Sequence, residues 1–302
     1  MQAEHSLSLT YPTPRHHSTS LSTQVSVPSM NPFDLKYQML GKQAIGVGGQ
    51  AKVFLCKDTK DGDIYVLKEI DLRPVRLGKD GSKRLAQLHR ELEIHSTVSH
   101  PHIVKCIEFF ETRDQGKMQI VLEYCSEGDV MDYMDRKTSK CLDESEAKKI
   151  VRQVASALKY LHGNKLLHRD IKPENILLSS NFDASGFPIC KITDFGVSKE
   201  LNGTVARTFT GSPIYMAPEI TLDESINQYS YPADMWALGV SLYVMLCSSF
   251  PEFDDDFNAA PKGKRWDELS AGAKALIAGL IRSSPSERLT AEQVLECDWL
   301  KE

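Results

Sequence analysis

Residues 168–175 read His168-Arg-Asp-Ile-Lys-Pro-Glu-Asn175, and the interpretation of the rest of the chain starts from them. This stretch groups the carboxylate of Asp170, the ammonium of Lys172 and the amide of Asn175 in a predicted loop after a helix. An aspartate can accept a proton from a hydroxyl nucleophile, a lysine can neutralise a phosphoryl group in transfer, and an amide oxygen can bind a hard cation. A polar surface loop has little structural reason to group these side chains, so the stretch indicates catalytic chemistry.

A second acidic motif follows at Asp194-Phe195-Gly196, directly after a β-type run at 190–193. Its carboxylate can supply a second oxygen ligand for Mg²⁺ beside Asn175, since this hard cation prefers oxygen ligands. The tripeptide alone is a frequent coincidence, but its position shortly after 168–175 is not. We therefore predict that Asn175 and Asp194 hold magnesium.

A glycine-rich stretch near the N-terminus reads Gly46-Val47-Gly48-Gly49-Gln-Ala51-Lys-Val53. Glycines let a hairpin backbone approach a polyphosphate closely and offer it N–H donors. The stretch lies between strands rather than between a strand and a helix, which disfavours a Rossmann fingerprint and a Walker loop. Taken alone it is a weak signal, and a plain glycine-rich turn is an equal alternative.

One lysine and one glutamate complete the set of candidate polar groups. Lys68 lies on the predicted strand 64–70, and Glu91 lies on the predicted helix 83–97. An ion pair between them would aim the ammonium at phosphate oxygens. Each residue alone is also compatible with an ordinary exposed surface position.

Hydrophobic patterns divide the chain into a small β-rich part and a mostly helical part. Strands are predicted at 51–56, 64–70, 103–110 and 118–124, and helices at 83–97, 145–162, 233–246, 267–281 and 290–299. Asp143 and Glu146 predict a capped start for 145–162. The apolar run 233–246 is too short for a bilayer and contains Asp234, so we expect a buried helix.

Composition limits the function classes. The chain has 302 residues, a net charge of -5 and a pI near 6.0, which argues against binding to nucleic acid. Its seven cysteines form no C-x-x-C pair, so no zinc or redox motif is indicated, and the odd count suits a reducing compartment. No run predicts a membrane span or a secretory signal. We expect a cytoplasmic protein, with the nucleus as an alternative.

The ordered motifs resemble the catalytic domain of eukaryotic protein kinases, from about Tyr37 to Trp299. Ala217-Pro218-Glu219, Asp234-Met-Trp-Ala-Leu-Gly239 and Arg288 also fit this family. The resemblance implies that Asp234 supports the backbone of the loop 168–175 and that Arg288 pairs with Glu219. The resemblance implies an α+β, bilobal protein-kinase fold, with a small N-terminal antiparallel sheet carrying one helix and a larger, mostly helical C-terminal lobe. It divides the chain into a disordered Ser/Thr/Pro-rich tail (1–32), an N-lobe (33–122), a hinge (123–128) and a C-lobe (129–302).

The resemblance also implies roles for single residues, with ATP and Mg²⁺ as cofactors. Asp170 would be the base, Lys172 would contact the γ-phosphate, and Lys68 would bind the α- and β-phosphates while pairing with Glu91. Asn175 and Asp194 would hold Mg²⁺. The nucleotide would contact Gly46, Val47, Gly48, Gly49, Val53, Val66, Lys68, Glu123, Cys125, Asp129 and Leu177.

The resemblance further indicates transfer to serine or threonine hydroxyls of protein substrates. Lys172-Pro-Glu174 is typical of serine/threonine kinases, and other stretches resemble the calcium/calmodulin-dependent, checkpoint and autophagy-initiating groups. Glu174 and Asp129 resemble acidic positions that select basic residues beside the acceptor. Thr208 lies where such kinases receive an activating phosphate, from another kinase or by autophosphorylation, and Arg169 would bind that phosphate. Thr204 and Thr210 are the local alternatives to Thr208.

Two departures from the family pattern stand out, and one acidic run needs an interpretation. His95 and Cys106 occupy positions where large apolar residues normally join the spine that supports the active site, so a looser active state is expected. The segment after Phe253 is shortened where a substrate-docking helix usually lies. Asp254-Asp-Asp256 is interpreted as a helix cap rather than a metal site.

Two alternatives to an active serine/threonine kinase are open. A pseudokinase scaffold would bind nucleotide and partners on the same fold without efficient catalysis, but no key polar residue is missing. A small-molecule kinase of related fold is disfavoured by Ala217-Pro218-Glu219, which belongs to a platform for peptide substrates.

Overall fold

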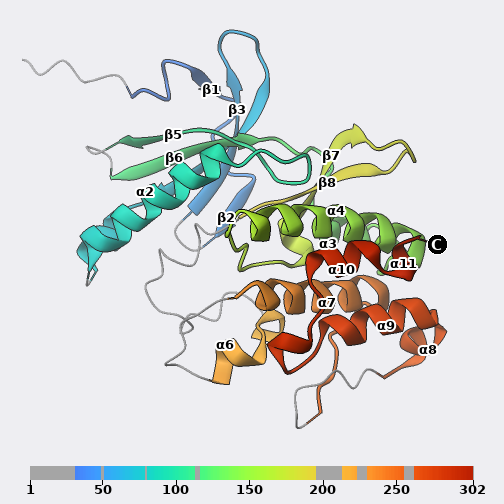
Figure 1. Cartoon of the computed structure of the whole chain (residues 1–302). Helices are drawn as coiled ribbons and strands as arrows, with labels where there is room; N and C mark the ends of the chain where they lie inside the picture. Colours follow the sequence, from blue (N-terminus) through green and yellow to red (C-terminus); the bar gives the residue numbers. More distant parts are fainter. Residues whose placement is uncertain are drawn as a thin grey trace, which may run out of the picture.

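The computed structural model describes residues 31–48, 51–78, 80–112, 116–194, 213–222, 230–254 and 262–301. Figure 1 shows a sheet with one long helix across it, joined to a larger body of helices. This arrangement confirms the predicted bilobal α+β fold. No helix in the described ranges combines the length and the hydropathy that crossing a bilayer requires.

The N-lobe is built on one antiparallel sheet. Its strands are β1 (Tyr37–Met39), β2 (Gly46–Gly48), β3 (Ala51–Asp58), β4 (Ile64–Asp71), β5 (Cys106–Thr112) and β6 (Lys117–Glu123). They run in the order β1-β3-β4-β6-β5, and β2 pairs with β3. Strand β5 starts three residues later than predicted, because residues 103–105 pair elsewhere, with Ile192 and Glu123.

Strand register decides which side chains share a face. Val53 on β3 lies opposite Lys68 on β4, and directly opposed residues of paired strands point to the same side. Val66 lies two positions before Lys68, so it also points to this side. The register therefore groups the predicted roof of the nucleotide pocket with the predicted phosphate-binding lysine.

Helix α2 (Gly81–Thr97) lies across the sheet (Figure 1), and the short helix α1 (Arg73–Leu77) packs against α2. Helix α1 was not predicted, and Pro74 at its start pre-sets the backbone for a helix. Helix α2 corresponds to the predicted helix 83–97 and buries Leu88 and Leu92 in the N-lobe core.

The C-lobe contains a short hairpin and a set of helices. These elements are β7 (Ile176–Phe182), β8 (Pro188–Ile192), α3 (Val130–Asp135), α4 (Glu144–Gly163), α6 (Pro218–Leu222), α7 (Tyr231–Cys247), α8 (Lys264–Glu268), α9 (Ala271–Leu280), α10 (Ala291–Glu296) and α11 (Asp298–Lys301). The predicted capping box of Asp143 and Glu146 begins α4. Helix α7 is buried from Ala233 to Cys247, as its unbroken apolar run indicated.

Two predicted helices are each divided in the structure. The run 267–281 contains a break before α9, because Ser270 has an extended backbone and its side chain accepts the N–H of Ala273 as an N-cap. The run 290–299 breaks at Cys297, whose backbone is extended between α10 and α11. Periodicity alone did not separate these short helices, because both apolar faces point to one core.

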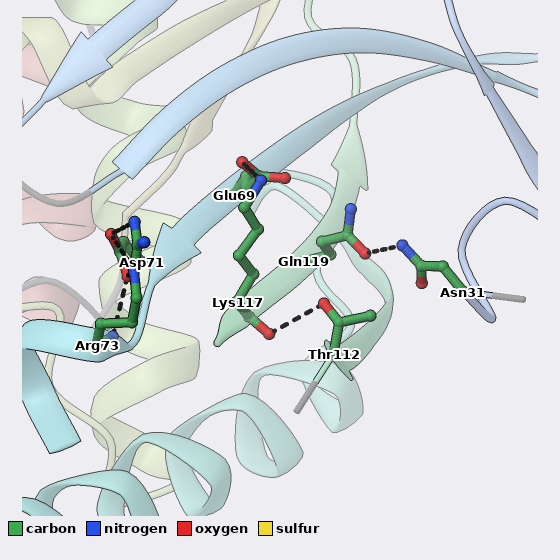
Figure 2. A network of polar contacts seen from close by, with 7 residues as sticks. All are labelled: Asn31, Glu69, Asp71, Arg73, Thr112, Lys117 and Gln119. Carbon is green, nitrogen blue, oxygen red and sulfur yellow. Dashed lines mark hydrogen bonds and ion pairs between the residues drawn. The ribbon is translucent and has the colours of Figure 1, made fainter. Parts of the chain in front are cut away.

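The chain before β1 packs on the outer side of the N-lobe sheet. Phe33 is only 1% exposed and stacks on Tyr37 with ring centroids 5.3 Å apart. The Tyr37 hydroxyl donates to Glu108 Oε1 over 2.5 Å. Figure 2 shows the amide of Asn31 donating to Gln119 Oε1, over 2.9 Å. Residues just before the first strand therefore complete the core of the small lobe.

We expect Phe33→Ala to lower the free energy of unfolding by about 3–5 kcal/mol, because it leaves a cavity in this aromatic cluster. Urea unfolding followed by circular dichroism measures the change. Leu35→Ala is the matched control, since Leu35 is 59% exposed and its truncation should cost little. Equal losses in the two variants would contradict the packing described above.

Candidate active site

The loop 168–175 is held from below by one buried carboxylate. Asp234 on α7 is 1% exposed and accepts the backbone N–H of His168 at Oδ2 (3.0 Å) and that of Arg169 at Oδ1 (2.8 Å). The ring of His162, at the end of α4, lies 2.9 Å from Oδ2 through Nε2. Arg169 has a left-handed backbone (φ 71°). The hydrogen bonds from the N–H groups of His168 and Arg169 to Asp234 hold the backbone in this conformation. The support that the family resemblance implied for this loop is present.

Charge and burial oppose one another at Asp234. Burial raises the pKa of its carboxyl, but the hydrogen bond from His162 and the surrounding donors outweigh burial, so the pKa is lowered. The ionised form is therefore the one that the fold stabilises. The sequence analysis did not predict a role for His162. The only signal was a polar residue in the last turn of a helix with an apolar face.

The three polar side chains of the loop meet as predicted. Lys172 Nζ lies 3.1 Å from Asp170 Oδ2, and Asn175 Nδ2 donates to the same oxygen over 2.9 Å. Asn175 Nδ2 also donates to the Asp170 carbonyl over 2.7 Å, which fixes the side chain relative to the backbone. Among the described residues both donors to the carboxylate contact Oδ2, so Oδ1 is available to accept a proton.

Asp194 lies beside this loop. The N–H of Thr193 donates to the Asn175 carbonyl over 3.0 Å, which brings the residue after it close to Asn175. Asp194 Oδ1 lies 2.5 Å from Lys68 Nζ on β4. Burial raises the pKa of the Asp194 carboxyl, but the Lys68 ammonium outweighs it, so the pKa is lowered. The site thus joins a strand of the small lobe to the loop of the large lobe.

The predicted ion pair between Lys68 and Glu91 is not formed. Lys68 is buried and its carboxylate partner is Asp194. Asp194 has a left-handed backbone (φ 61°) where it makes this contact. Among the described residues, Asp194 supplies the one carboxylate that forms an ion pair with Lys68. Glu91 is on α2 as predicted and has interactions of its own. The sequence could not decide which of two acidic residues the lysine would meet.

Asn175 and Asp194 offer a donor set that fits a magnesium ion. Asn175 uses Nδ2 toward Asp170, which leaves its Oδ1 for a cation, and Asp194 supplies carboxylate oxygens. Magnesium commonly takes only one or two carboxylate or amide ligands from a protein and completes its shell with waters and phosphate oxygens. In the described part of the chain no group of three or more His, Cys, Asp or Glu residues could hold a metal.

Two of the apolar residues predicted to contact the nucleotide, Val66 and Leu177, belong to one cluster. Both are partly buried and pack against a set of buried residues that includes Leu122 and Cys125. Because the cluster draws on β4, β6 and β7, it spans the junction of the two lobes. Burial raises the pKa of the Cys125 thiol to about 12, so the thiol stays protonated and packs as a small apolar side chain.

The glycine-rich stretch is a β hairpin. Gly46 lies opposite Val53, Val47 opposite Lys52, and Gly48 opposite Ala51. This arrangement confirms the placement between strands that disfavoured a Rossmann or Walker loop. Gly49 lies outside the described residues.

The hinge and the first residue of the C-lobe carry two more candidates. The Glu123 side chain lies 3.0 Å from Lys191 Nζ, a partner that the sequence did not suggest. Asp129 caps α3 by accepting the N–H of Asp132 over 2.7 Å. Burial raises the pKa of the Asp129 carboxyl, and the charges of Asp132 and Glu174 add to this effect. Acidic groups therefore gather at this edge of the site.

His95 and Cys106 are both buried between α2 and β5. His95 Nε2 lies 3.1 Å from the Val104 carbonyl, and burial lowers the pKa of its ring. A neutral, hydrogen-bonded histidine is a satisfied core residue. The polar spine position is thus occupied by a side chain with a defined partner.

Below the site, Arg288 and Glu219 form the ion pair that the resemblance implied. Two parallel bonds of 2.6 Å join the guanidinium to the carboxylate, and the Arg288 side chain is fully buried. The guanidinium also lies 5.0 Å from the Trp236 ring centroid. Bidentate geometry of this kind ties α6, which begins at Pro218, to the end of the C-lobe.

Several predictions concern residues that the structure does not describe. They include Gly49 of the glycine-rich turn, Phe195 and Gly196 of the second acidic motif, Thr208, Asp255 and Asp256. The predicted tail also lies outside the described residues up to position 30.

We expect Asp234→Asn to lower the free energy of unfolding at pH 7 by about 2–4 kcal/mol, because an amide cannot accept all three donors. The wild-type carboxyl has a lowered pKa, so its stabilisation is complete above its unfolded value of about 4 and is lost as the pH falls through the folded value. Urea unfolding at pH values from about 6 down to about 2 should show a difference that shrinks only below about pH 4. The exposed Asp298→Asn is the control, and a constant difference at all pH values would refute the assignment.

Comparison with known proteins agrees with this geometry. The family model described as "Protein kinase domain" matches residues 40–300. Serine/threonine-protein kinase 33 of Mus musculus is 32% identical over 273 residues, covering 85% of this chain and 53% of that protein. Serine/threonine-protein kinase cds1 of Schizosaccharomyces pombe is 32% identical over 277 residues, covering 85% and 57% respectively.

A solved structure shows the same fold. The crystal structure of Rad53 1-466 in complex with AMP-PNP is 28% identical, covers 89% of this chain and 66% of that one, and has a TM-score of 0.70. The chain spans about half the length of the curated relatives named above. Its motifs, its bilobal fold and these matches lead to one conclusion: the chain belongs to the protein kinase domain family.

Proposed function

We propose that this protein transfers the γ-phosphoryl group of ATP, in the presence of Mg²⁺, to serine or threonine hydroxyls of protein substrates. The observation that carries the proposal is the convergence of Asp170, Lys172 and Asn175 beside Asp194 and Lys68. These five side chains come from both lobes and lie together at the junction between them. The relatives that the chain matches are named as serine/threonine kinases.

The proposed chemistry is mostly positioning and electrostatics. Asp170 accepts the proton of the substrate hydroxyl at Oδ1, while Lys172 and Asn175 hold Oδ2 in place. Asn175 and Asp194 would hold the magnesium ion, which would supply positive charge against the phosphates. Lys68, whose ammonium lies beside Asp194, is proposed to bind phosphate oxygens.

The pocket for the nucleotide base is proposed between the two lobes. Val53 and Val66 form its roof, Leu177 its floor, and the backbone groups of Glu123 and Cys125 the hydrogen-bonding edge. Asp129 is proposed to contact the ribose, although in this structure it also caps α3. Gly46, Val47, Gly48 and Gly49 are proposed to cover the phosphates.

Location and regulation are further proposals. All seven cysteines are free thiols, which supports a reducing compartment, either the cytoplasm or the nucleus. Phosphorylation of Thr208, by another kinase or by autophosphorylation, is proposed to raise activity by giving Arg169 a phosphate partner. The pseudokinase alternative has no observation in its favour.

We expect Asp170→Asn to lower kcat by about 10²–10⁴-fold, because an amide cannot accept the substrate proton. Nucleotide binding should persist, since Asn keeps the shape of the side chain. Mass spectrometry of the purified protein after incubation with Mg-ATP and substrate reads the phosphorylated residues, and a thermal shift with Mg-ATP checks binding.

The same spectra test the acceptor and the activation site. Phosphoserine or phosphothreonine should appear with the wild type only, and Thr208 should be among the modified residues. Equal phosphorylation by wild type and Asp170→Asn would overturn the role of Asp170. Equal activity of Thr208→Ala and wild type would overturn the role of Thr208.

The acidic edge formed by Asp129, Asp132 and Glu174 supports a preference for basic substrates, because like charges there already disfavour ionisation of Asp129. We expect Glu174→Gln to reduce the preference for Arg or Lys upstream of the acceptor by about fivefold, as for one partly exposed ion pair of ~1 kcal/mol. An arrayed peptide library measures this preference. Glu268→Gln, on α8 away from the loop, is the control, and a wild type without basic preference would refute the idea.

A further inference from the structure

A short segment behind the hinge bonds to both lobes. The N–H of Val104 donates to the Ile192 carbonyl at the end of β8, and the N–H of Ile192 donates to the His102 carbonyl, each over 3.0 Å. On the other side, the N–H of Glu123 donates to the Lys105 carbonyl over 3.0 Å. Through these backbone hydrogen bonds, residues 102–105 hold the end of β6 close to the end of β8.

One ion pair closes this arrangement directly. Lys191 on β8 reaches Glu123 at the end of β6, with Nζ and Oε1 3.0 Å apart. The other carboxylate oxygen, Oε2, accepts the N–H of Lys105 over 3.2 Å. The two side chains are only 12% and 28% exposed, so losing one partner would leave a poorly solvated charge.

The position of Lys191 connects three parts of the proposed nucleotide site. It lies opposite Leu177 in the pairing of β7 with β8, and three residues before Asp194. Its partner Glu123 is the first residue of the hinge. The ion pair thus links the hinge to the strand that leads to the proposed metal ligand.

Polar contacts join two strand ends that pack into separate cores. Leu122 on β6 and Ile192 at the end of β8 belong to different clusters of buried residues. A surface hollow of about 280 Å³, lined among others by Lys105, Glu123 and Lys191, lies beside the ion pair. The ion pair and the backbone bonds of 102–105 therefore connect the two strand ends directly.

We propose that Lys191 is a positioning residue that, through Glu123, fixes the hinge relative to the strand carrying Asp194. This inference rests on the proposed function, in which the hinge receives adenine and Asp194 receives magnesium. The affinity for a ligand that contacts only the hinge does not depend on the distance between the hinge and Asp194. Mg-ATP engages both ends at once, so its affinity depends on the distance between them.

The other end of β6 offers a matched control. There Lys117 pairs with Glu69 on β4, with Nζ and Oε1 2.8 Å apart and side chains 35% and 19% exposed. Figure 2 shows this pair beside Asp71 and Arg73, at the end of the sheet away from the hinge. Like the first pair, it is a lysine–glutamate pair with one member on β6, but its lysine is more exposed and it joins two strands of one lobe.

The experiment compares two ligands by isothermal titration calorimetry: adenosine alone, and ATP with Mg²⁺. The variants are Lys191→Met, Glu123→Gln, the double variant, Lys191→Arg and Lys117→Met. In Lys191→Met and Glu123→Gln we expect Mg-ATP to bind about five- to tenfold more weakly, while adenosine changes less than twofold. The double variant should match the single ones, because both remove the same pair.

Lys191→Arg should keep the wild-type ratio of the two affinities, since a guanidinium can still pair with Glu123, and Lys117→Met should keep it within twofold. An unchanged ratio in both Lys191→Met and Glu123→Gln, or an equal change in Lys117→Met, would overturn the inference. If Lys191→Met does not fold by circular dichroism, the isosteric Glu123→Gln decides. A wild type that binds neither ligand would overturn the proposed function itself, which is a distinct result.

Discussion

The buried carboxylate of Asp234 is the group on which the catalytic loop depends. A loop of polar residues between a helix and a strand would normally sample many conformations, yet two N–H donors of this loop end on one carboxylate. The carboxylate comes from α7, which is buried along nearly its whole length. Its position is therefore set by the core of the large lobe, and the loop takes its shape from that core.

The small lobe contributes a side chain that the large lobe needs. Lys68 lies on β4, in the middle of the sheet order, and its ammonium reaches across the junction to Asp194. Both Lys68 and Asp234 are largely buried, so each has its charge compensated by a specific partner rather than by water. The junction between the lobes is polar on the side of Asp194 and apolar around Leu122 and Val66.

Much of the local structure was predictable. The capping box at Asp143, the helix 83–97 and the strands around Lys68 are encoded by residues within a few positions of one another. The separation of α9 from α8 at Ser270 was missed, because an N-cap inside an apolar run does not interrupt the helical period. Helix α1 was missed because five residues are too few to show a period.

Residue order was enough to predict the chemistry of the loop 168–175, because Asp170, Lys172 and Asn175 are close along the chain and meet within one turn. Partner choice across the lobes needed the fold. Lys68 meets Asp194, 126 positions away, rather than Glu91, and Glu123 meets Lys191 behind the hinge. Opposite charges attract without regard to order in the sequence, so the packing of two lobes decides which pair comes within 3 Å.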